Sequence, residues 1–593
     1  MSDFMDLLAD LSPEQQELFR LRLARLHQAG APTPAPPIPR QPRTDAPFPL
    51  SFGQQRLWFL DQLMPDDLSY VIPLAVRLSG RLNHDALNRS LRALIQRHEI
   101  LRTTFAQGAD LQPVQVIAPP QPESVVVPQI DLRDWPLSER HALAQRRATS
   151  EIRQAFNLAT GPLLRSTLLR LDDDEHWLIL AMHHIISDQW SLGVLIRELG
   201  ILYQAYAANP PADPVLPELP IQYADYAVWL RDQLHGEVLD QHLGYWRQQL
   251  ADLPLLELLT DFPRPPVYTS SGATYPVELP LDISTTLHEL SQRESATLFM
   301  ALLAAFNVLL HRWSGQTDIV IGSPIANRNH TATEGLIGFL INTLALRVDL
   351  DGNPTFRELL ARVRRVCLDA YRHQDLPFEM VVDAVQTRRD RSRNPLFQVS
   401  FVLLNAPMEP LQLPEISLSP LELERGATQF DLSLSMIETP AGLRGRLEYN
   451  TNLFDRATIA RLVGHFGTLL QGIVANPDQP IAALPLLSEA ERALFAAWNT
   501  TACAFPPQPV SQIFEAQAAR TPDAIALQFN EQQVSYAELN ARANRLAHYL
   551  RSLGVGAETR VGLCVERSLD LVVGMLGILK AGGAYVPLDP EYP

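Results

Sequence analysis

Two adjacent histidines, His183 and His184, follow an apolar run from Trp177 to Met182 that predicts a buried strand. Four residues after His184, Asp188 opens a helical pattern. A strand, a histidine pair, a short turn and an aspartate hold an imidazole at the edge of a sheet, where it can exchange a proton with a substrate. Because a histidine pair at a strand end is more often structural than catalytic, this interpretation depends on the rest of the sequence.

The composition is that of a globular protein with a large core. The chain has 593 residues, of which 46% are hydrophobic and 19% charged, and its formal net charge is −17. The acidic balance argues against nucleic-acid binding. The three cysteines, Cys367, Cys503 and Cys564, share no metal-ligand spacing, which favours a reducing compartment and no metal site. The sequence contains neither a signal peptide nor a membrane-spanning stretch, so we expect a cytoplasmic protein.

Proline content and hydrophobic periodicity divide the chain into segments. Residues 1–30 predict a linker or docking helix, and residues 31–48 a stiff proline-rich linker. Strands and helices then alternate up to residue 485, which is typical of an α/β layered fold. Residues 486–510 predict a second linker. Residues 511–593 carry another α/β pattern that stops in mid-pattern, so we expect the chain to be a fragment of a longer protein.

Seven segments between residues 50 and 400 resemble, in order, the core motifs of the condensation domain of nonribosomal peptide synthetases. They are residues 50–60 (LSFGQQRLWFL), 97–105 (RHEILRTTF), 182–191 (MHHIISDQWS), 223–229 (YADYAVW), 337–344 (IGFLINTL), 373–379 (HQDLPFE) and 391–397 (RSRNPLF). The resemblance implies two chloramphenicol-acetyltransferase-like lobes in a V arrangement, residues 49–222 and 223–485, with the active site in a tunnel between them.

Two later segments, residues 534–540 (VSYAELN) and 579–590 (LKAGGAYVPLDP), resemble the first two core motifs of an adenylation domain. In that family the phosphate-binding loop and the ATP-binding residues lie further along the chain. The resemblance therefore implies that residues 511–593 are the α/β start of an adenylate-forming domain without an ATP site or adenylation activity. Because the chain has no carrier-protein serine motif, we expect it to carry no phosphopantetheine of its own.

The resemblance also implies a reaction. The amine of an acceptor aminoacyl thioester attacks the carbonyl of a donor acyl or peptidyl thioester, and an amide bond forms. Both substrates arrive on the phosphopantetheine arms of upstream and downstream peptidyl carrier proteins. The spacer between His184 and Asp188 looks more like that of domains that take an L-configured donor. We expect a monomer with no bound cofactor, whose other partner is the rest of the adenylation domain.

The motifs assign roles to five residues. His184 is expected at the amine, as a base, as a hydrogen-bond acceptor or as a stabiliser of the oxyanion. His183 should point the other way off the strand and be structural. Asp188 is either the N-cap of the following helix or, by resemblance, the partner of Arg328 in a structural ion pair; both roles shape the site. Arg102 either faces the site or packs at the end of its helix.

One position departs from the family pattern. The family usually has glycine after the motif aspartate, and this chain has Gln189. A glutamine adds bulk and hydrogen-bonding groups where glycine would allow close approach of a substrate arm. We expect Gln189, together with Trp190 and Ser191, to line the tunnel and to affect efficiency more than the type of reaction.

Three alternative interpretations remain. A catalytically idle condensation-like platform would recruit partner domains, and Gln189 is the feature that keeps this possibility open. An epimerisation domain shares the His-His-Asp pattern, but the adenylation segment that follows argues against it. An acyltransferase that uses coenzyme A is disfavoured by the same fused segment.

Overall fold

The computed structural model describes residues 37–44, 46–120, 126–208, 210, 212, 214–385, 390–404, 413, 415–421, 423–505 and 507–591. They form two compact units that divide between Glu489 and Ala490. The helix expected over residues 1–30 lies outside the described residues. Among those described, no single helix is long and apolar enough to cross a membrane, although the bent pair Leu281–Arg293 and Leu298–Ser314 meets the length and composition criteria together.

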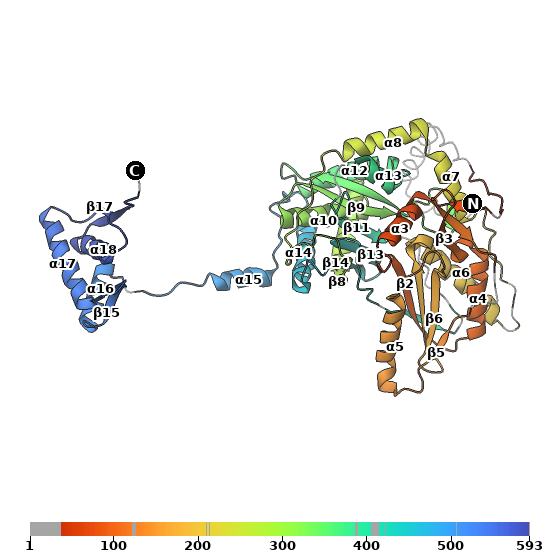
Figure 1. Ribbon diagram of the computed structural model, residues 1–593, viewed down its shortest axis with the longest axis horizontal. Helices are drawn as coiled ribbons and strands as arrows, with labels where there is room; N and C mark the ends of the chain where they lie inside the picture. The colour runs from red at the N-terminus through yellow and green to blue at the C-terminus, as the bar shows by residue number, and fades with distance from the viewer. Residues whose placement is uncertain are drawn as a thin grey trace, which may run out of the picture. The chain divides into compact units, whose positions relative to one another are not determined.

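The first lobe of the larger unit is built on a five-stranded sheet (Figure 1). Its strands, in spatial order, are β12 (Ser417–Pro420), β2 (Val71–Ser79), β7 (Glu175–His183), β6 (Leu164–Arg170) and β5 (Gln129–Asp131). Both faces of β7 are buried. Leu178 and Leu180 pack against helices α4 (His84–Arg97) and α6 (Gln189–Ala207), whereas Trp177 and Ile179 pack against helix α5 (Leu137–Ile152). A strand covered on both faces reads as a continuous apolar run, which is the pattern that the sequence shows here.

The other elements of the first lobe surround this sheet. The helices are α3 (Phe52–Leu63), α4 (His84–Arg97), α5 (Leu137–Ile152), α6 (Gln189–Ala207) and α7 (Tyr223–Gln233), with the 3₁₀ turns η1 (Glu99–Arg102) and η3 (His184–Ile186). A small sheet has the strand order β1 (Phe48–Pro49), β4 (Pro113–Ile117) and β3 (Thr103–Gln107). Helix α7 packs into the core of the first lobe through Tyr223, Tyr226 and Ala227, beyond the lobe boundary expected at residues 222–223.

The second lobe is built on a six-stranded sheet with its own core. Its strand order is β10 (Asn342–Asp349), β9 (Asp318–Ile325), β11 (Val399–Leu404), β13 (Leu432–Thr439), β14 (Gly442–Asn450) and β8 (Gly272–Pro280). The helices are α8 (Gly236–Gln249), α9 (Leu281–Arg293), α10 (Leu298–Ser314), α11 (Thr331–Glu334), α12 (Phe356–Arg372), α13 (Phe378–Val385) and α14 (Arg456–Ala475). Helix α10, between β8 and β9 in the chain, is almost wholly buried in this core.

The second lobe reaches back to the first at two places. Strand β12 pairs antiparallel with β2, so a late segment completes the sheet of the first lobe. Residues 423–430, which we call the crossing segment, then lead to β13. Separately, Leu336, Ile337 and Leu340 are buried in the core of the first lobe. Residues distant in the sequence therefore meet around the end of β7, where His184 lies.

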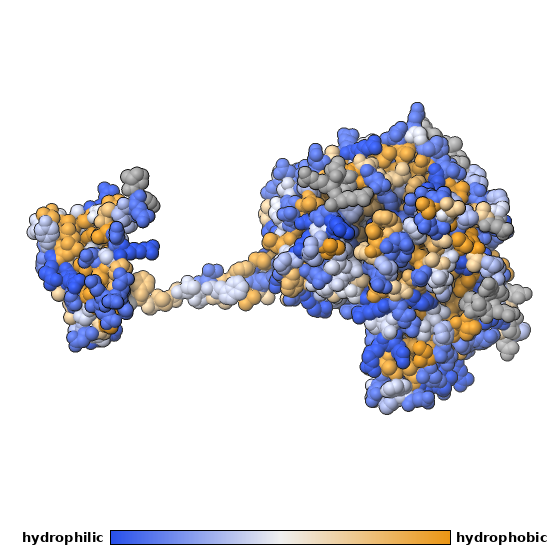
Figure 2. Space-filling model, viewed as in Figure 1, coloured by the Kyte–Doolittle hydropathy of each residue, from blue (hydrophilic) through white to orange (hydrophobic). Residues whose placement is uncertain are grey.

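The smaller unit is a short α/β assembly preceded by helix α15 (Glu489–Trp498). Its elements are α16 (Val510–Arg520), β15 (Ile525–Phe529), β16 (Gln532–Ser535), α17 (Tyr536–Ser552), β17 (Arg560–Cys564), α18 (Leu569–Ala581) and β18 (Ala584–Leu588). Strands β17 and β18 run parallel, and β15 and β16 form a hairpin. Two-stranded sheets cover little apolar surface, and Ile525, Leu553 and Leu588 remain exposed. Figure 2 shows hydrophobic residues on the surface of this unit.

The described part of the proline-rich segment, residues 37–44, has no helix or strand and is tied to the first lobe. Ile38 is buried in the core, and Arg43 forms ion pairs with Glu99 and Asp225. These contacts dock the segment on the lobe. Sequence alone did not predict them, because the partner acids lie 56 and 182 residues further along the chain.

Candidate active site

His184 lies directly after β7. Its backbone N–H donates to the Tyr70 carbonyl at 2.8 Å, which joins the turn to the start of β2, and its Nδ1 lies 2.8 Å from the Ser187 carbonyl oxygen. Because a carbonyl oxygen can only accept, Nδ1 carries the ring proton and Nε2 keeps its lone pair. The turn therefore selects the tautomer that a general base needs.

The surroundings of His184 keep the imidazole neutral. Burial lowers its pKa from the ordinary value of 6.5, and the Ser187 carbonyl and the Asp188 carboxylate oppose this effect only in part. The positive charge of Arg425 lowers the pKa further. The Phe339 ring meets the imidazole edge to face, with the ring centroids 5.0 Å apart. A neutral ring in a fixed orientation can accept a proton or a hydrogen bond through Nε2.

His183 belongs to the framework. It is buried, its Nδ1 accepts a hydrogen bond from the Ile185 backbone N–H at 3.1 Å, and its ring packs against Phe156 and Tyr70. Burial lowers the pKa of His183 to about 3. A buried side chain in this position orders the turn after β7.

Asp188 combines the two roles that the sequence left open. Its Oδ1 accepts from the Ser191 backbone N–H at 2.8 Å and so caps helix α6, while Arg328 donates to the same oxygen at 3.1 Å. Its Oδ2 accepts from the backbone N–H of Leu340 at 3.0 Å. The two side chains of the ion pair are each 2% exposed. Asp188 thus joins the turn after His184 to two segments of the second lobe.

A cavity of about 370 Å³ lies beside His184, between the two lobes. The first lobe contributes an apolar wall that includes Ile72, Leu74, Leu192 and Ile196. The second lobe contributes a polar wall from the crossing segment, β13 and β14 that includes Arg425, Ser433, Ser435, Arg446 and Glu448. A cavity with one apolar wall and convergent polar groups on the other is typical of a ligand site.

Of the three residues expected to line the tunnel, Gln189 lines this cavity and the other two do not. Ser191 is fully buried: its Oγ donates to the Gly338 carbonyl at 2.9 Å and accepts from the Gly338 N–H at 3.0 Å. Trp190 donates from Nε1 to the Glu334 carbonyl at 3.0 Å. Successive helical residues are rotated by about 100°, so only one of three neighbours at the start of α6 can face the cavity.

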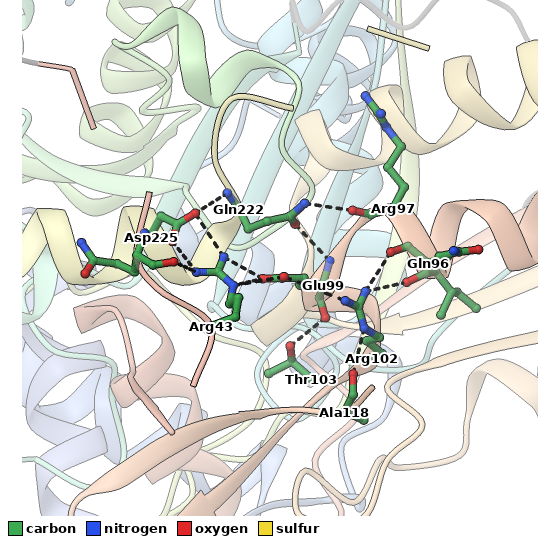
Figure 3. Close-up of polar contacts among 11 residues, drawn as sticks. Arg43, Gln96, Arg97, Glu99, Arg102, Thr103, Ala118, Gln222 and Asp225 are labelled. Carbon is green, nitrogen blue, oxygen red and sulfur yellow. Dashed lines mark hydrogen bonds and ion pairs between the residues drawn. The ribbon is translucent and has the colours of Figure 1, made fainter. Parts of the chain in front are cut away.

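Arg102 does not line this cavity. Figure 3 shows its guanidinium in contact with Gln96 and Ala118. Its guanidinium donates to the carbonyls of Ile95, Gln96 and Ala118 at 2.8 to 3.1 Å, and Glu99 lies 3.9 Å away. The carbonyls of Ile95 and Gln96 belong to the last turn of α4, where intrahelical partners are missing and a cation is favourable. Arg102 therefore caps a helix, which is the packing role of the two that the sequence allowed.

Sequence reasoning missed three residues beside His184. Phe339 packs on the imidazole, and Arg425 and Glu448 form an ion pair of 3.2 Å on the opposite cavity wall. Phe339 lies within the motif at residues 337–344, so the resemblance could have placed it near the active site. Arg425 and Glu448 lie outside the seven motifs, and only the pairing of distant strands brings them to the site.

The chain belongs to the condensation-domain family. The family model described as "Condensation domain" matches residues 45–495, and the model of the AMP-binding enzymes matches residues 514–593. The sequence-based recognition of a condensation domain followed by the start of an adenylate-forming domain is therefore confirmed.

The relatives belong to peptide synthetases. One of the linear gramicidin synthase subunits of Brevibacillus parabrevis is 51% identical over 565 residues, 94% of this chain and 7% of that protein. Phosphinothricin tripeptide synthetase PhsC of Streptomyces viridochromogenes is 42% identical over 602 residues, which cover this whole chain and 54% of that protein. The chain thus spans only part of the length of these relatives.

Solved structures have the same fold. The X-domain from teicoplanin biosynthesis is similar over 76% of this chain and 100% of its own, with a TM-score of 0.69 and 28% identity. The four-domain nonribosomal peptide synthetase holo-AB3403, bound to AMP and glycine, is similar over 96% of this chain and 43% of its own, with a TM-score of 0.77 and 26% identity. The expected α/β class, a condensation fold plus an adenylation fragment, is confirmed.

Proposed function

We propose that this condensation domain joins two carrier-bound substrates through an amide bond. The observation that carries the proposal is the neutral His184, whose Nε2 keeps a lone pair beside a cavity between the lobes. Family membership supports the reaction class, and the relatives named as peptide synthetases support a peptidyl or aminoacyl product.

The chemistry demands little of the protein. An α-amino group has a pKa of about 7.7–8.0 in water, so a useful fraction of the acceptor is neutral at pH 7. Its nitrogen attacks the donor carbonyl, the new C–N bond forms, and the C–S bond breaks to release the thiol of the donor arm. His184 takes or holds the proton that leaves the amine, and this proton finally resides on the released thiol. Confining two tethered substrates in one cavity removes much of the entropic barrier.

Asp188 and Arg328 support this reaction by holding His184 in position. Their ion pair holds the start of α6 and the backbone of Leu340 next to the turn that orients His184. A displacement of the imidazole by about 1 Å is enough to slow a reaction that depends on alignment by roughly two orders of magnitude. We therefore assign Asp188 to shaping the site and not to contact with the substrate.

The partners follow from the reaction. An upstream carrier protein presents the donor thioester and a downstream carrier protein presents the acceptor, each through a phosphopantetheine arm that enters as a substrate. Residues 511–593 are the start of an adenylation domain, and the rest of that domain is therefore a further partner. We infer no ATP site in these residues, because the recognised motifs are the first two of that domain.

A second candidate function is a platform that binds a partner enzyme without catalysis. The X-domain from teicoplanin biosynthesis, which has the same fold, has been solved in a complex with OxyB. In this chain Gln189 lines the cavity, and its bulk is the feature that favours the platform. The His184 tautomer and the buried Asp188–Arg328 pair favour catalysis.

A condensation assay separates these functions. A donor carrier and an acceptor carrier are each loaded with an aminoacyl thioester, and the acceptor is followed by intact-protein mass spectrometry with the wild type, His184→Ala and His235→Ala. We expect dipeptidyl product from the wild type and from His235→Ala, whose exposed histidine lies outside the cavity, and a loss of about 100-fold or more in His184→Ala.

The opposite result favours the platform. If the wild type gives no product with several donor and acceptor pairs while it still binds both carriers, the amide-forming function is wrong. A shift of the donor mass without product, together with exchange of the α-hydrogen for deuterium from D₂O, would instead indicate epimerisation.

A further inference from the structure

The crossing segment joins the two lobes directly beside His184. From the first lobe, the Arg153 guanidinium donates to the Glu424 carbonyl at 3.1 Å, and Gln429 of the crossing segment donates from Nε2 to the Ser69 carbonyl at 3.1 Å. On the other side, the Gly272 N–H of strand β8 donates to the Gly426 carbonyl at 3.0 Å. The segment therefore cannot move without disturbing both lobes.

Arg425 makes the connection closest to the catalytic turn. Its Nη1 donates to the carbonyl of Val71 at 3.2 Å, and its Nη2 pairs with Glu448 of β14 at 3.2 Å. Val71 lies opposite His183 in the register of β2 and β7, and the preceding residue, Tyr70, accepts the backbone N–H of His184. The carbonyl of Val71 therefore binds Arg425 of the second lobe, and the carbonyl of the preceding residue, Tyr70, binds the turn that carries His184.

We propose that Arg425 is a positioning residue of the amide-forming site: its guanidinium locks the second lobe to the strand start that holds His184, and its positive charge lies across the cavity from the imidazole. The inference rests on the proposed function and adds a residue that none of the recognised motifs contains. Arginine suits this role because its planar fork reaches a carbonyl and a carboxylate at once and keeps its charge at every relevant pH.

The other charged groups around His184 are already paired. Asp188 is paired with Arg328, and Glu448 lies between Arg425 at 3.2 Å and Arg446 at 3.5 Å. His183 is held neutral, and Glu424 and Tyr70 are further ionisable residues on the neighbouring segments. Burial lowers the pKa of His184 most; among these charges, Asp188 raises it and Arg425 lowers it.

For the reaction, the consequence of the Arg425 charge is that Nε2 of His184 keeps its lone pair at neutral pH. Without the cation, the imidazole binds a proton more readily, and the protonated ring cannot accept a proton from the amine. Removing the Arg425 charge should therefore raise the titration midpoint of His184, by roughly half a pH unit for one charge across a partly solvated cavity. The same change should slow amide formation more at pH 6 than at pH 8.

The first test measures the ring titration by NMR on protein labelled at histidine Cε1. The chain has 15 histidines, and the His184 signal is assigned by its loss in His184→Ala. We expect a higher midpoint in Arg425→Gln, a midpoint within about 0.2 units of wild type in Arg425→Lys, and no shift in Arg446→Gln, which removes a cation from the same wall. This titration needs no substrate, so its result stands whether or not the domain forms amides.

An unchanged or lower midpoint in a folded Arg425→Gln protein would overturn the proposal. So would an equal shift in Arg425→Lys, because the charge would then not be the cause. If Arg425→Gln does not fold, Glu448→Gln provides the opposite test: it leaves the Arg425 charge without its carboxylate and should lower the midpoint of His184. An unchanged midpoint in Glu448→Gln would equally contradict the assigned role.

Discussion

Arg328 donates to both carboxylate oxygens of Asp188, at 3.1 and 3.4 Å, across 140 residues of sequence, and both side chains are 2% exposed. Breaking a buried ion pair on one side leaves an uncompensated charge, which typically costs about 3–5 kcal/mol. We expect Asp188→Ala to lower the free energy of unfolding by about that amount, because the variant also loses the cap of α6. Urea denaturation at pH 7 measures the loss.

Asp188→Asn is the matched control for this prediction. An asparagine keeps the size of the aspartate and the oxygen that caps α6, but it loses the charge and replaces the oxygen that accepts from the Leu340 N–H by an NH2 donor. Because the cap remains, Asp188→Asn should be less destabilising than alanine. If both variants unfold within about 0.5 kcal/mol of the wild type, the ion pair does not hold the two segments together and Asp188 has another role.

His183 should make the protein less stable in mild acid. Its pKa in the folded state is about 3, below the ordinary value of 6.5, so the unfolded chain binds a proton between these limits and the folded chain does not. The free energy of unfolding therefore falls as the pH drops from 6.5 towards 3, by up to about 1.4 kcal/mol per pH unit from this residue. His183→Asn, which keeps an acceptor for the Ile185 N–H, should show a shallower fall between pH 6.5 and 5. An identical slope would contradict the assignment.

Residues 37–44 should contribute to the stability of the first lobe. Arg43 bonds to Asp225, whose side chain is fully buried, and to Glu99, as Figure 3 shows. Removing residues 1–44 should therefore destabilise the lobe by about 3 kcal/mol more than removing residues 1–36. Thermal unfolding of the two shortened chains measures this difference. Arg40→Ala is the matched control, because Arg40 lies 3.9 Å from the exposed Glu218 and should cost less than about 0.5 kcal/mol.

Gln189 should limit the size of the substrate that the cavity accepts. Gln189→Gly removes a side chain from the cavity wall, and we expect faster reaction of bulky donors by up to roughly tenfold, with little change for a glycyl donor. Rates with glycyl and leucyl donors on the same carrier protein measure the difference. Equal rates in wild type and variant for both donors would show that the glutamine does not obstruct the tunnel.

The sequence predicted local elements well because their signals are local. The apolar run from Trp177 to Met182, which predicted a buried strand, lies within β7. Strand β12 was not predicted, because its pairing with β2 joins residues more than 300 positions apart and a four-residue edge strand has no periodicity of its own.

In the site, too, sequence predicted some positions and missed contacts that depend on the folded chain. The resemblance indicated that Asp188 and Arg328 would meet, and the structure places them in contact. Trp190 and Ser191 follow Gln189 in sequence, yet the turn of α6 directs them to Glu334 and Gly338 and away from the cavity. Gly338 also lets the Tyr223 ring pack against its backbone, because a Cβ there would lie 2.0 Å from that ring; a single sequence does not reveal which residue packs against a glycine.

The claim that both substrates meet at Nε2 of His184 is tested most directly by covalent labelling. A carrier protein loaded with a bromoacetyl pantetheine arm is incubated with the domain, and the imidazole displaces bromide to form a C–N bond that peptide mass spectrometry locates. Cys503 and Cys564 are exposed thiols and are replaced by serine beforehand. The account predicts one adduct, on His184, that is absent from His184→Ala. An adduct on His183, or none while the carrier protein binds, would contradict it.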